Sequence, residues 1–210
     1  MAVHQQLQRR ERERLARRKD IMQAARSVFA KHGYKNATLE QIARRAEFAK
    51  GTFYNYFDSK SDIFQEILVS LLDQMAVVAR ETMNEGGTTR EKFHRYSVRI
   101  INLFKEEEDF LKIVMREMNR MMLEEQHEKL AYFRKKFHRM KDILAESLRA
   151  DIAKGRVVNE KPEELAHLFI EMIHIRSARC SRDEGSLVAL DPEKESAFIV
   201  KLFFDGASTR

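Results

Sequence analysis

Apolar residues recur at the spacing of α-helices along most of the chain. The first such stretch ends near Lys31, where Gly33 suits a left-handed helix cap, and its inward face carries Ile21, Ala24, Ala25, Val28 and Phe29. Only two prolines and seven glycines interrupt the 210 residues, and the stretches between them are rich in good helix formers such as Ala, Leu, Glu and Lys. The pattern predicts an all-α protein of about nine helices.

The segment after Gly33 carries closely spaced helix start and stop signals. Thr38 and Gln41 are the two ends of a capping box, in which each side chain accepts a hydrogen bond from the other residue's backbone amide, so a short helix is expected from Leu39. A break around Glu47 and a second short helix over 50–57 follow. Two short helices joined by a tight turn make a helix-turn-helix, whose second helix can enter the major groove of DNA.

Six longer helices are predicted beyond this motif. They span about 60–83, 88–105, 109–123, 128–154 and 162–182, and the last one begins at Asp191-Pro192. We therefore divide the chain into an arm at 1–19, a helix-turn-helix domain at 20–64 and a helical body at 65–210.

Positive charge is concentrated in the first sixty residues. Residues 1–60 carry 14 Lys and Arg against 6 Asp and Glu, a net charge of +8, whereas residues 61–210 carry 25 against 27. Seven of the basic residues lie in the arm. Such a segment favours a polyanion partner, because neutralising phosphates releases counterions, although an ordinary solvated basic helix has the same composition.

Two runs of residues in the predicted helix-turn-helix follow a known pattern. They are Thr38–Ala46 (TLEQIARRA) and Lys50–Lys60 (KGTFYNYFDSK). Together they closely resemble the DNA-binding signature of the TetR family of transcriptional regulators, and the resemblance is specific over about residues 20–64. Beyond that range only the expected architecture is similar.

The resemblance implies a set of DNA contacts. Thr38 and Lys60 would meet phosphates, Tyr54 and Tyr56 would brace on backbone or base edges, and the groove would be faced by Lys50, Gly51, Thr52 and Asn55. These roles suit the chemistry, because hydroxyl and ammonium groups position a protein on phosphates while Lys and Asn can recognise base edges. Either tyrosine could instead fill the small core of this domain.

Two positions depart from the family pattern. Glu47 stands where the turn usually has glycine, and Ala49 stands where Ser or Thr usually caps the recognition helix. We therefore expect Glu47 to adopt a left-handed conformation at an energetic cost and to place negative charge near DNA. The basic arm would offset this charge by contacting the DNA backbone or a minor groove.

The last two helices are apolar over more of their surface than one core contact needs. Pairing them with their symmetry mates in a four-helix interface, as the resemblance implies, would bury the excess and give two heads for a palindromic operator. The expected interface contains Leu165, Phe169, Met172, Ile173, Phe198, Leu202 and Phe203.

A methionine-rich face on the helix expected at 109–123 suggests a small-molecule site. Methionine adapts to irregular shapes, so we expect a pocket for an apolar or amphipathic ligand, although ordinary core filling would give the same pattern. The 65–210 body would then serve both ligand binding and dimerisation. Candidate lining residues are Phe93, Tyr96, Met115, Met118, Met122, Phe133, Phe137, His138, His167, Glu171 and His174.

Glu-x-x-His pairs occur at 91–94, 124–127, 164–167 and 171–174. Such pairs build di-metal sites in helix bundles, but only where ligands converge from four helices. We expect no metal site, and we assign these positions to polar pocket lining or to an exposed, salt-linked stripe.

The sequence favours a ligand-responsive DNA-binding regulator, of the repressor type by resemblance. No apolar run approaches the roughly 20 residues that a membrane span needs, and the N-terminus lacks a secretory core, so a cytoplasmic protein is expected. No cofactor is expected, and neither a nucleophile-base set nor a phosphate-binding Gly-rich loop supports catalysis. Two alternatives stay open: a di-metal or other helical enzyme, and a ligand-sequestering or scaffolding protein with a vestigial DNA head.

Overall fold

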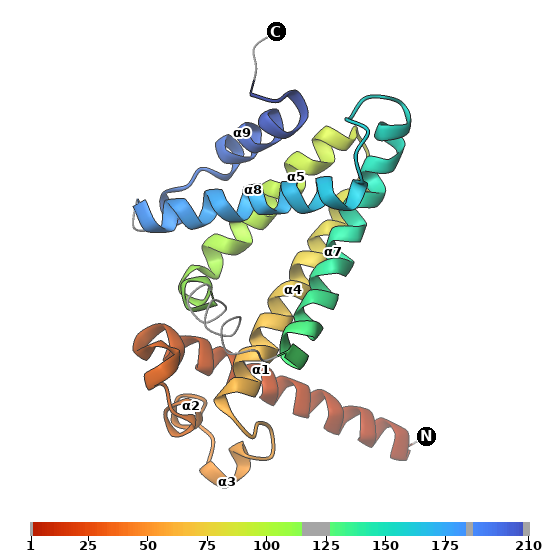
Figure 1. Ribbon diagram of the computed structural model, residues 1–210. Coiled ribbons are helices and arrows are strands. Elements are labelled where there is room, and N and C mark those ends of the chain that lie inside the picture. Colours follow the sequence, from red (N-terminus) through yellow and green to blue (C-terminus); the bar gives the residue numbers. More distant parts are fainter. Residues whose placement is uncertain (1, 115–126, 184–186, 208–210) are drawn as a thin grey trace. The chain divides into compact units, whose positions relative to one another are not determined.

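The chain is helical almost throughout the computed structural model, which describes residues 2–114, 127–183 and 187–207 (Figure 1). Within these ranges lie eight α-helices with the bounds given below, a further helical stretch at 108–114, one short 3-10 helix and no strand. The expected all-α fold is confirmed. None of the described helices combines the length and the apolarity that crossing a membrane requires.

The helices form two compact units, which we call the head and the body. The head holds the described residues of Met1–Ser70 and Asp109–Glu124, and the body holds those of Leu71–Glu108 and Glu125–Arg210. α4, Lys60–Asn84, contributes residues to both.

α1 runs over Ala2–Asn36 and is interrupted at Gly33, whose φ of 71° and ψ of 161° are not helical. This break stands where the sequence predicts a helix cap. The basic arm is the first part of the same helix, because residues 8–17 are helical and exposed on every side. Ile21 and Phe29, by contrast, are fully buried.

The capping box at the start of α2, Leu39–Arg45, is confirmed. The Gln41 amide donates to the Thr38 hydroxyl oxygen at 3.2 Å, and the Thr38 amide donates to Gln41 Oε1 at 2.9 Å. α3 is shorter than predicted, Lys50–Phe53, because the amides of Asn55 and Tyr56 turn back to the carbonyls of Thr52 and Phe53.

Aromatic and branched side chains hold the head together. Ile42, Phe53, Phe57 and Ile63 are each at most 3% exposed. Fully burying a side chain of this size contributes about 1.5–3 kcal/mol. The small core therefore fixes which side chains of α3 point outward.

The body is built from α5 (Thr89–Glu106), α7 (His127–Ala153), α8 (Pro162–Asp183), η1 (Leu187–Ala189) and α9 (Pro192–Asp205). α7 packs on α8, and α9 packs on both α5 and α8 (Figure 1). Thr88 caps α5 with a second capping box, which it forms with Glu91. Phe93 lies at the centre, with its ring 4.7 Å from that of Phe169 and 5.9 Å from that of Phe203.

Candidate DNA-binding site

The outer surface of the head around α3 presents the residues expected to face DNA. Phe53 and Phe57 point into the core, at 1% and 3% exposure, which leaves Thr52 and Asn55 exposed and Tyr54 43% exposed. Gly51 is exposed too, and a Cβ added there would meet no atom within 4 Å. Lys50 is the first residue of α3, but its side chain lies outside the described ones.

Thr38 combines a local structural role with accessibility. Its hydroxyl oxygen accepts the Gln41 amide, yet the residue is exposed. The hydroxyl hydrogen is therefore available to donate to an anion at the start of α2.

Tyr56 is half-buried and braces the loop after α3. Its ring lies edge-on to Phe48, with 5.7 Å between centroids, and its carbonyl oxygen accepts a 2.8 Å hydrogen bond from Arg18 Nη1. Its hydroxyl has no hydrogen-bond partner within the described parts of the chain. The ring of Tyr56 thus packs within the head, and a contact of its hydroxyl with DNA stays a prediction.

Lys60 has partners other than the phosphate that the family resemblance implies. Its ammonium group donates to the carbonyl oxygens of Tyr34, Lys35 and Ala37 at 2.8, 2.8 and 3.0 Å. These three acceptors use all three of its hydrogens. Lys60 therefore holds the end of α1 in this structure.

The left-handed conformation expected of Glu47 is confirmed, with φ at 59°. A residue with a Cβ pays roughly 1–2 kcal/mol in this region. The side chain is exposed, so the strain is not offset by packing.

Sequence reasoning missed the pair formed by Arg18 and Glu66. The Arg18 guanidinium forms two contacts with the Glu66 carboxylate, one of them at 3.0 Å, while also binding the Tyr56 carbonyl. The hydrogen bond with Glu66 raises the pKa of Arg18 above its ordinary value. The two residues are 48 positions apart, so no local pattern could have revealed the pair.

The candidate pocket residues of the body fall into two groups. Phe93 and Tyr96 are fully buried parts of the core, and the Tyr96 hydroxyl reaches the Met140 sulfur at 3.5 Å. Burial raises the pKa of Tyr96. Met115, Met118 and Met122 lie outside the described residues, and so does the side chain of Phe133.

A second group lies together on α7 and α8. The Phe137 ring is 5.8 Å from His167 and 6.4 Å from His174, and His174 Nδ1 lies 3.5 Å from Glu171 Oε1. His167 Nδ1 is buried and has no hydrogen-bond partner among the described residues. His138 is exposed on α7.

The Glu-x-x-His pairs do not converge on a common point in the described chain. Glu91 belongs to the capping box of α5, where the Thr88 amide donates to it at 2.7 Å, and His94 faces Glu193 at 3.5 Å. No group of three or more His, Cys, Asp or Glu side chains that could hold a metal ion occurs within the described ranges. Glu171 and His174 form the salt-linked contact that was one of the two interpretations.

The expected dimer interface requires correction. Phe169 and Ile173 are 0% and 1% exposed inside the body, because their side of α8 faces α5 and α7. Phe203 also packs into this core, on Phe93 and Phe169. Leu165, Met172 and Leu202 are half-buried, and Phe198 is 50% exposed. Leu168 and Ile175, which the prediction left out, are 53% and 62% exposed on the outer side of α8.

Comparison with known proteins agrees with this geometry. Residues 21–67 match the family model described as bacterial regulatory proteins, tetR family. The chain is 35% identical over 97 residues to the HTH-type regulator YhgD of Bacillus subtilis, which covers 46% of this chain and 51% of YhgD. It is 27% identical over 160 residues to the transcriptional repressor AcnR of Corynebacterium efficiens, covering 74% and 77% of the two chains.

Similar solved structures include the regulator FadR of Bacillus subtilis in complex with stearoyl-CoA. The TM-score is 0.75 at 21% identity, covering 90% of this chain and 99% of that one. This likeness concerns the fold of both units. The chain therefore carries the helix-turn-helix domain of the tetR family of regulatory proteins at residues 21–67, on a fold similar to that of solved TetR-family regulators.

Proposed function

We propose that the protein is a dimeric repressor that binds a palindromic operator and leaves it when an amphipathic ligand, of the acyl-CoA class, enters the body. The observation that carries the proposal is the outward placement of Thr52, Tyr54 and Asn55 on the head, beside a strongly basic helix. An amide side chain such as Asn55 can recognise a base edge, while hydroxyl groups fix the register on phosphates.

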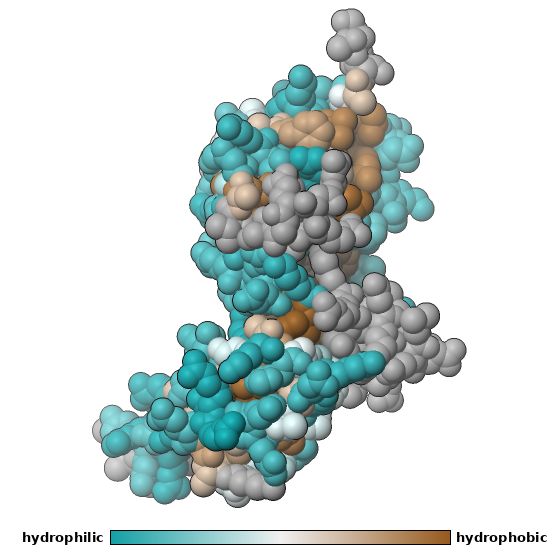
Figure 2. Space-filling view, turned by 90° about the vertical axis from the view of Figure 1, so that its left-hand side faces the viewer, coloured by the Kyte–Doolittle hydropathy of each residue, from teal (hydrophilic) through white to brown (hydrophobic). Residues whose placement is uncertain are grey.

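Dimerisation is supported by the apolar outer side of α8 and α9. Leu168 and Ile175 are seven residues apart on α8 and share one side of it, and Phe198 of α9 is also half exposed. On the face drawn in Figure 2, hydrophobic residues gather on the body, whereas the head is mainly hydrophilic. A second copy of the chain would remove this apolar surface from water and supply the second head.

The ligand class is supported by the body and by the relatives. Around the two histidines of α8, the structure combines the apolar rings of Phe137 and Phe104 with polar atoms. One of these atoms is His167 Nδ1, which has no hydrogen-bond partner among the described side chains and backbone. A group of side chains of this kind would suit a ligand with an apolar chain and a polar group. The FadR structure contains stearoyl-CoA, and AcnR is a repressor, which favours an acyl-CoA ligand and repression.

Selection of duplexes from random-sequence DNA on the full-length protein tests the first part. We expect the retained sequences to contain inverted repeats. Asn55→Ala should weaken binding to a selected duplex by about tenfold or more, since a good base contact contributes about 1–3 kcal/mol. Asn159→Ala, which removes another exposed asparagine far along the chain, should leave the affinity unchanged.

The second part is tested by adding stearoyl-CoA or free coenzyme A to the protein-DNA complex. Stearoyl-CoA should release the duplex, and coenzyme A alone should not. A ligand shifts the equilibrium only when it binds the two states unequally. Selection that enriches no sequence would overturn the DNA-reading role, and release by both compounds or by neither would overturn the acyl-CoA assignment.

A further inference from the structure

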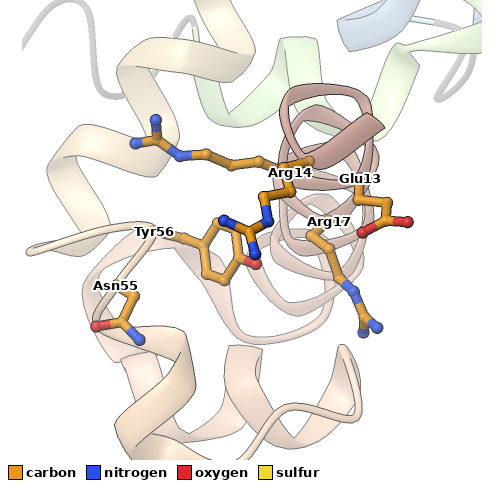
Figure 3. A pocket seen from close by; sticks show the side chains of 6 residues that line it. Glu13, Arg14, Arg17, Asn55 and Tyr56 are labelled. Atoms are coloured by element: carbon orange, nitrogen blue, oxygen red, sulfur yellow. The ribbon is translucent and has the colours of Figure 1, made fainter. Parts of the chain in front are cut away.

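An open cavity of about 330 Å³ lies in the head between the arm and the residues after α3. Its lining consists of Arg10, Glu13, Arg14, Arg17, Asn55 and Tyr56, which we call the arginine cleft. Figure 3 shows Arg14 and Arg17 on α1, with Asn55 and Tyr56 across the cleft from that helix.

Helix geometry accounts for the three arginines. Positions 10, 14 and 17 lie four and three residues apart, so an α-helix with 3.6 residues per turn brings them onto one side. Arg12 and Lys19 lie on the opposite side of α1 by the same spacing. The cleft is therefore a property of one side of the arm, not of its total charge.

Contacts of Arg18 and Arg17 hold this side of α1 beside the helix-turn-helix. Arg18 binds the Tyr56 carbonyl at 2.8 Å and also contacts Glu66. The Arg17 guanidinium carbon lies 5.4 Å from the centre of the Phe48 ring, which in turn packs edge-on against Tyr56. The arm and the end of α3 are thus joined through side chains of the head core.

The charges in the cleft are unbalanced. Arg10 and Arg14 have no acidic partner within the described residues, and both are exposed. The one carboxylate, that of Glu13, accepts a 2.9 Å hydrogen bond from Arg9, and Figure 3 shows it directed away from Asn55. The cleft therefore presents guanidinium groups, an amide and a phenol hydroxyl with little negative charge.

We propose that the arginine cleft holds a backbone phosphodiester of the DNA whose groove α3 enters. Guanidinium groups bind phosphate oxygens with two parallel hydrogen bonds, and a Tyr hydroxyl is a common additional donor to phosphates. This inference rests on the proposed function and adds a second set of contacts, from the arm, beside those of the helix-turn-helix.

The test compares two variants of the full-length protein with equal charge loss. Arg10→Gln/Arg14→Gln removes the cleft, and Arg12→Gln/Lys19→Gln removes two charges from the opposite side of the same helix. Affinity for a duplex selected on the wild-type protein is measured over a series of salt concentrations. We expect the cleft variant to bind several-fold to tenfold more weakly, with a salt slope shallower by about 0.9 for each phosphate that the protein no longer neutralises.

Neutral methylphosphonates placed one at a time along the duplex locate the contact. The wild type and the Arg12→Gln/Lys19→Gln variant should lose affinity at one or two positions to which the cleft variant is insensitive. If both variants lose affinity by the same factor and keep the wild-type pattern of sensitive positions, the cleft inference is overturned. Sequence-specific DNA binding would be unaffected by that result. If the wild-type protein selects no duplex, the proposed function fails and the inference fails with it.

A further titration distinguishes a contact with the DNA backbone from a binding site for free anions. Inorganic phosphate replaces chloride at constant ionic strength during the same titration. We expect no saturable competition. Saturable competition that disappears in the cleft variant would show a free-phosphate site and would overturn the assignment to the DNA backbone.

Discussion

The ammonium group of Lys60 lies 2.8 Å from the carbonyl oxygen of Tyr34 and 5.0 Å from the centre of the Tyr34 ring. The first residue of α4 thereby closes the end of α1, just after Gly33 has broken that helix. Such an end exposes carbonyl oxygens without intrahelical donors, and a cation placed there satisfies them.

Lys60→Met should destabilise the head. Removing the ammonium group leaves three carbonyls short of a donor, and the loss of a donor to a buried acceptor costs about 1–3 kcal/mol. Urea unfolding of the purified protein measures the change. Lys19→Met removes an exposed lysine and should change the free energy of unfolding little. Equal stability of both variants, with DNA affinity reduced only in Lys60→Met, would favour a phosphate contact instead.

The two capping boxes provide a matched pair for Thr38. Thr38→Ala and Thr88→Ala should each lower the free energy of unfolding by about 1 kcal/mol, because each removes the acceptor at a helix N-cap. Only Thr38→Ala should also weaken binding to the selected duplex, and Thr38→Ser should restore it. Equal affinity of the two alanine variants would argue against a contact from Thr38.

Replacing Glu47 should relieve backbone strain at φ 59°. Glu47→Gly is expected to stabilise the protein by roughly 0.5–1 kcal/mol after allowing for the entropy of glycine. Glu47→Ala removes the same charge but keeps the strained conformation, so its thermal midpoint should stay at or below that of the wild type. An equal gain in stability in both variants would mean that loss of the negative charge, not relief of backbone strain, causes the stabilisation.

Ile175 and Val158 have nearly the same exposed fraction, so a matched pair of substitutions at these positions tests whether the outer side of α8 is a dimer interface. Ile175 is 62% exposed on α8, and Val158, in the segment between α7 and α8, is 63% exposed. Ile175→Asp should shift the mass measured by light scattering from that of a dimer to that of a monomer, because a buried unpaired charge is costly. Val158→Asp should remain dimeric. Dimers in both variants would place the interface elsewhere.

The ionised Glu171 carboxylate should stabilise the folded protein, and this stabilisation should be lost in acid. The hydrogen bond from His174, aided by the charges of His174 and His167, lowers the pKa of Glu171 below its ordinary value of 4.5. A carboxyl whose pKa is depressed in the folded state stabilises that state above its unfolded pKa, and the benefit is lost as the pH falls through the folded pKa. Wild type should therefore exceed His174→Gln in stability at pH 5, and the difference should shrink toward pH 3.

Carbon NMR titration of the Glu171 carboxyl provides the direct measurement. Its pKa should move back toward 4.5 in His174→Gln. An unchanged pKa in that variant would mean that the 3.5 Å contact between Glu171 and His174 has no electrostatic effect in solution.

Features that depend on neighbours in the chain could be predicted from the sequence. The capping boxes at Thr38 and Thr88 and the cap at Asp191 each involve residues at most three apart, so their chemistry is visible in a short window. The left-handed turn at Glu47 was expected from the family resemblance, because the family usually has glycine at that position. The outward positions around α3 follow as well, once Phe53 and Phe57 are assigned to the core.

Features that depend on how helices pack could not be predicted. Both sides of α8 carry apolar residues, and the sequence does not tell which side meets α5 and α7, so Phe169 and Ile173 were assigned to the wrong surface. The contacts of Lys60 with the end of α1 and of Arg18 with Glu66 join residues more than twenty positions apart. Their geometry exists only after α1 and α4 have packed.

The exposed stretch of α1 at residues 8–17 has a thermodynamic consequence. Because no side of it is buried, tertiary packing contributes little there beyond the contact of Arg17 with Phe48, and the helix depends on its own backbone bonds and on pairs such as Arg9 with Glu13. A helix of this length is only marginally stable in water by itself, and repulsion among its arginines weakens it further. Neutralisation by a polyanion would remove that repulsion, so association and helix formation in this stretch should strengthen each other, and both should diminish together as the temperature rises.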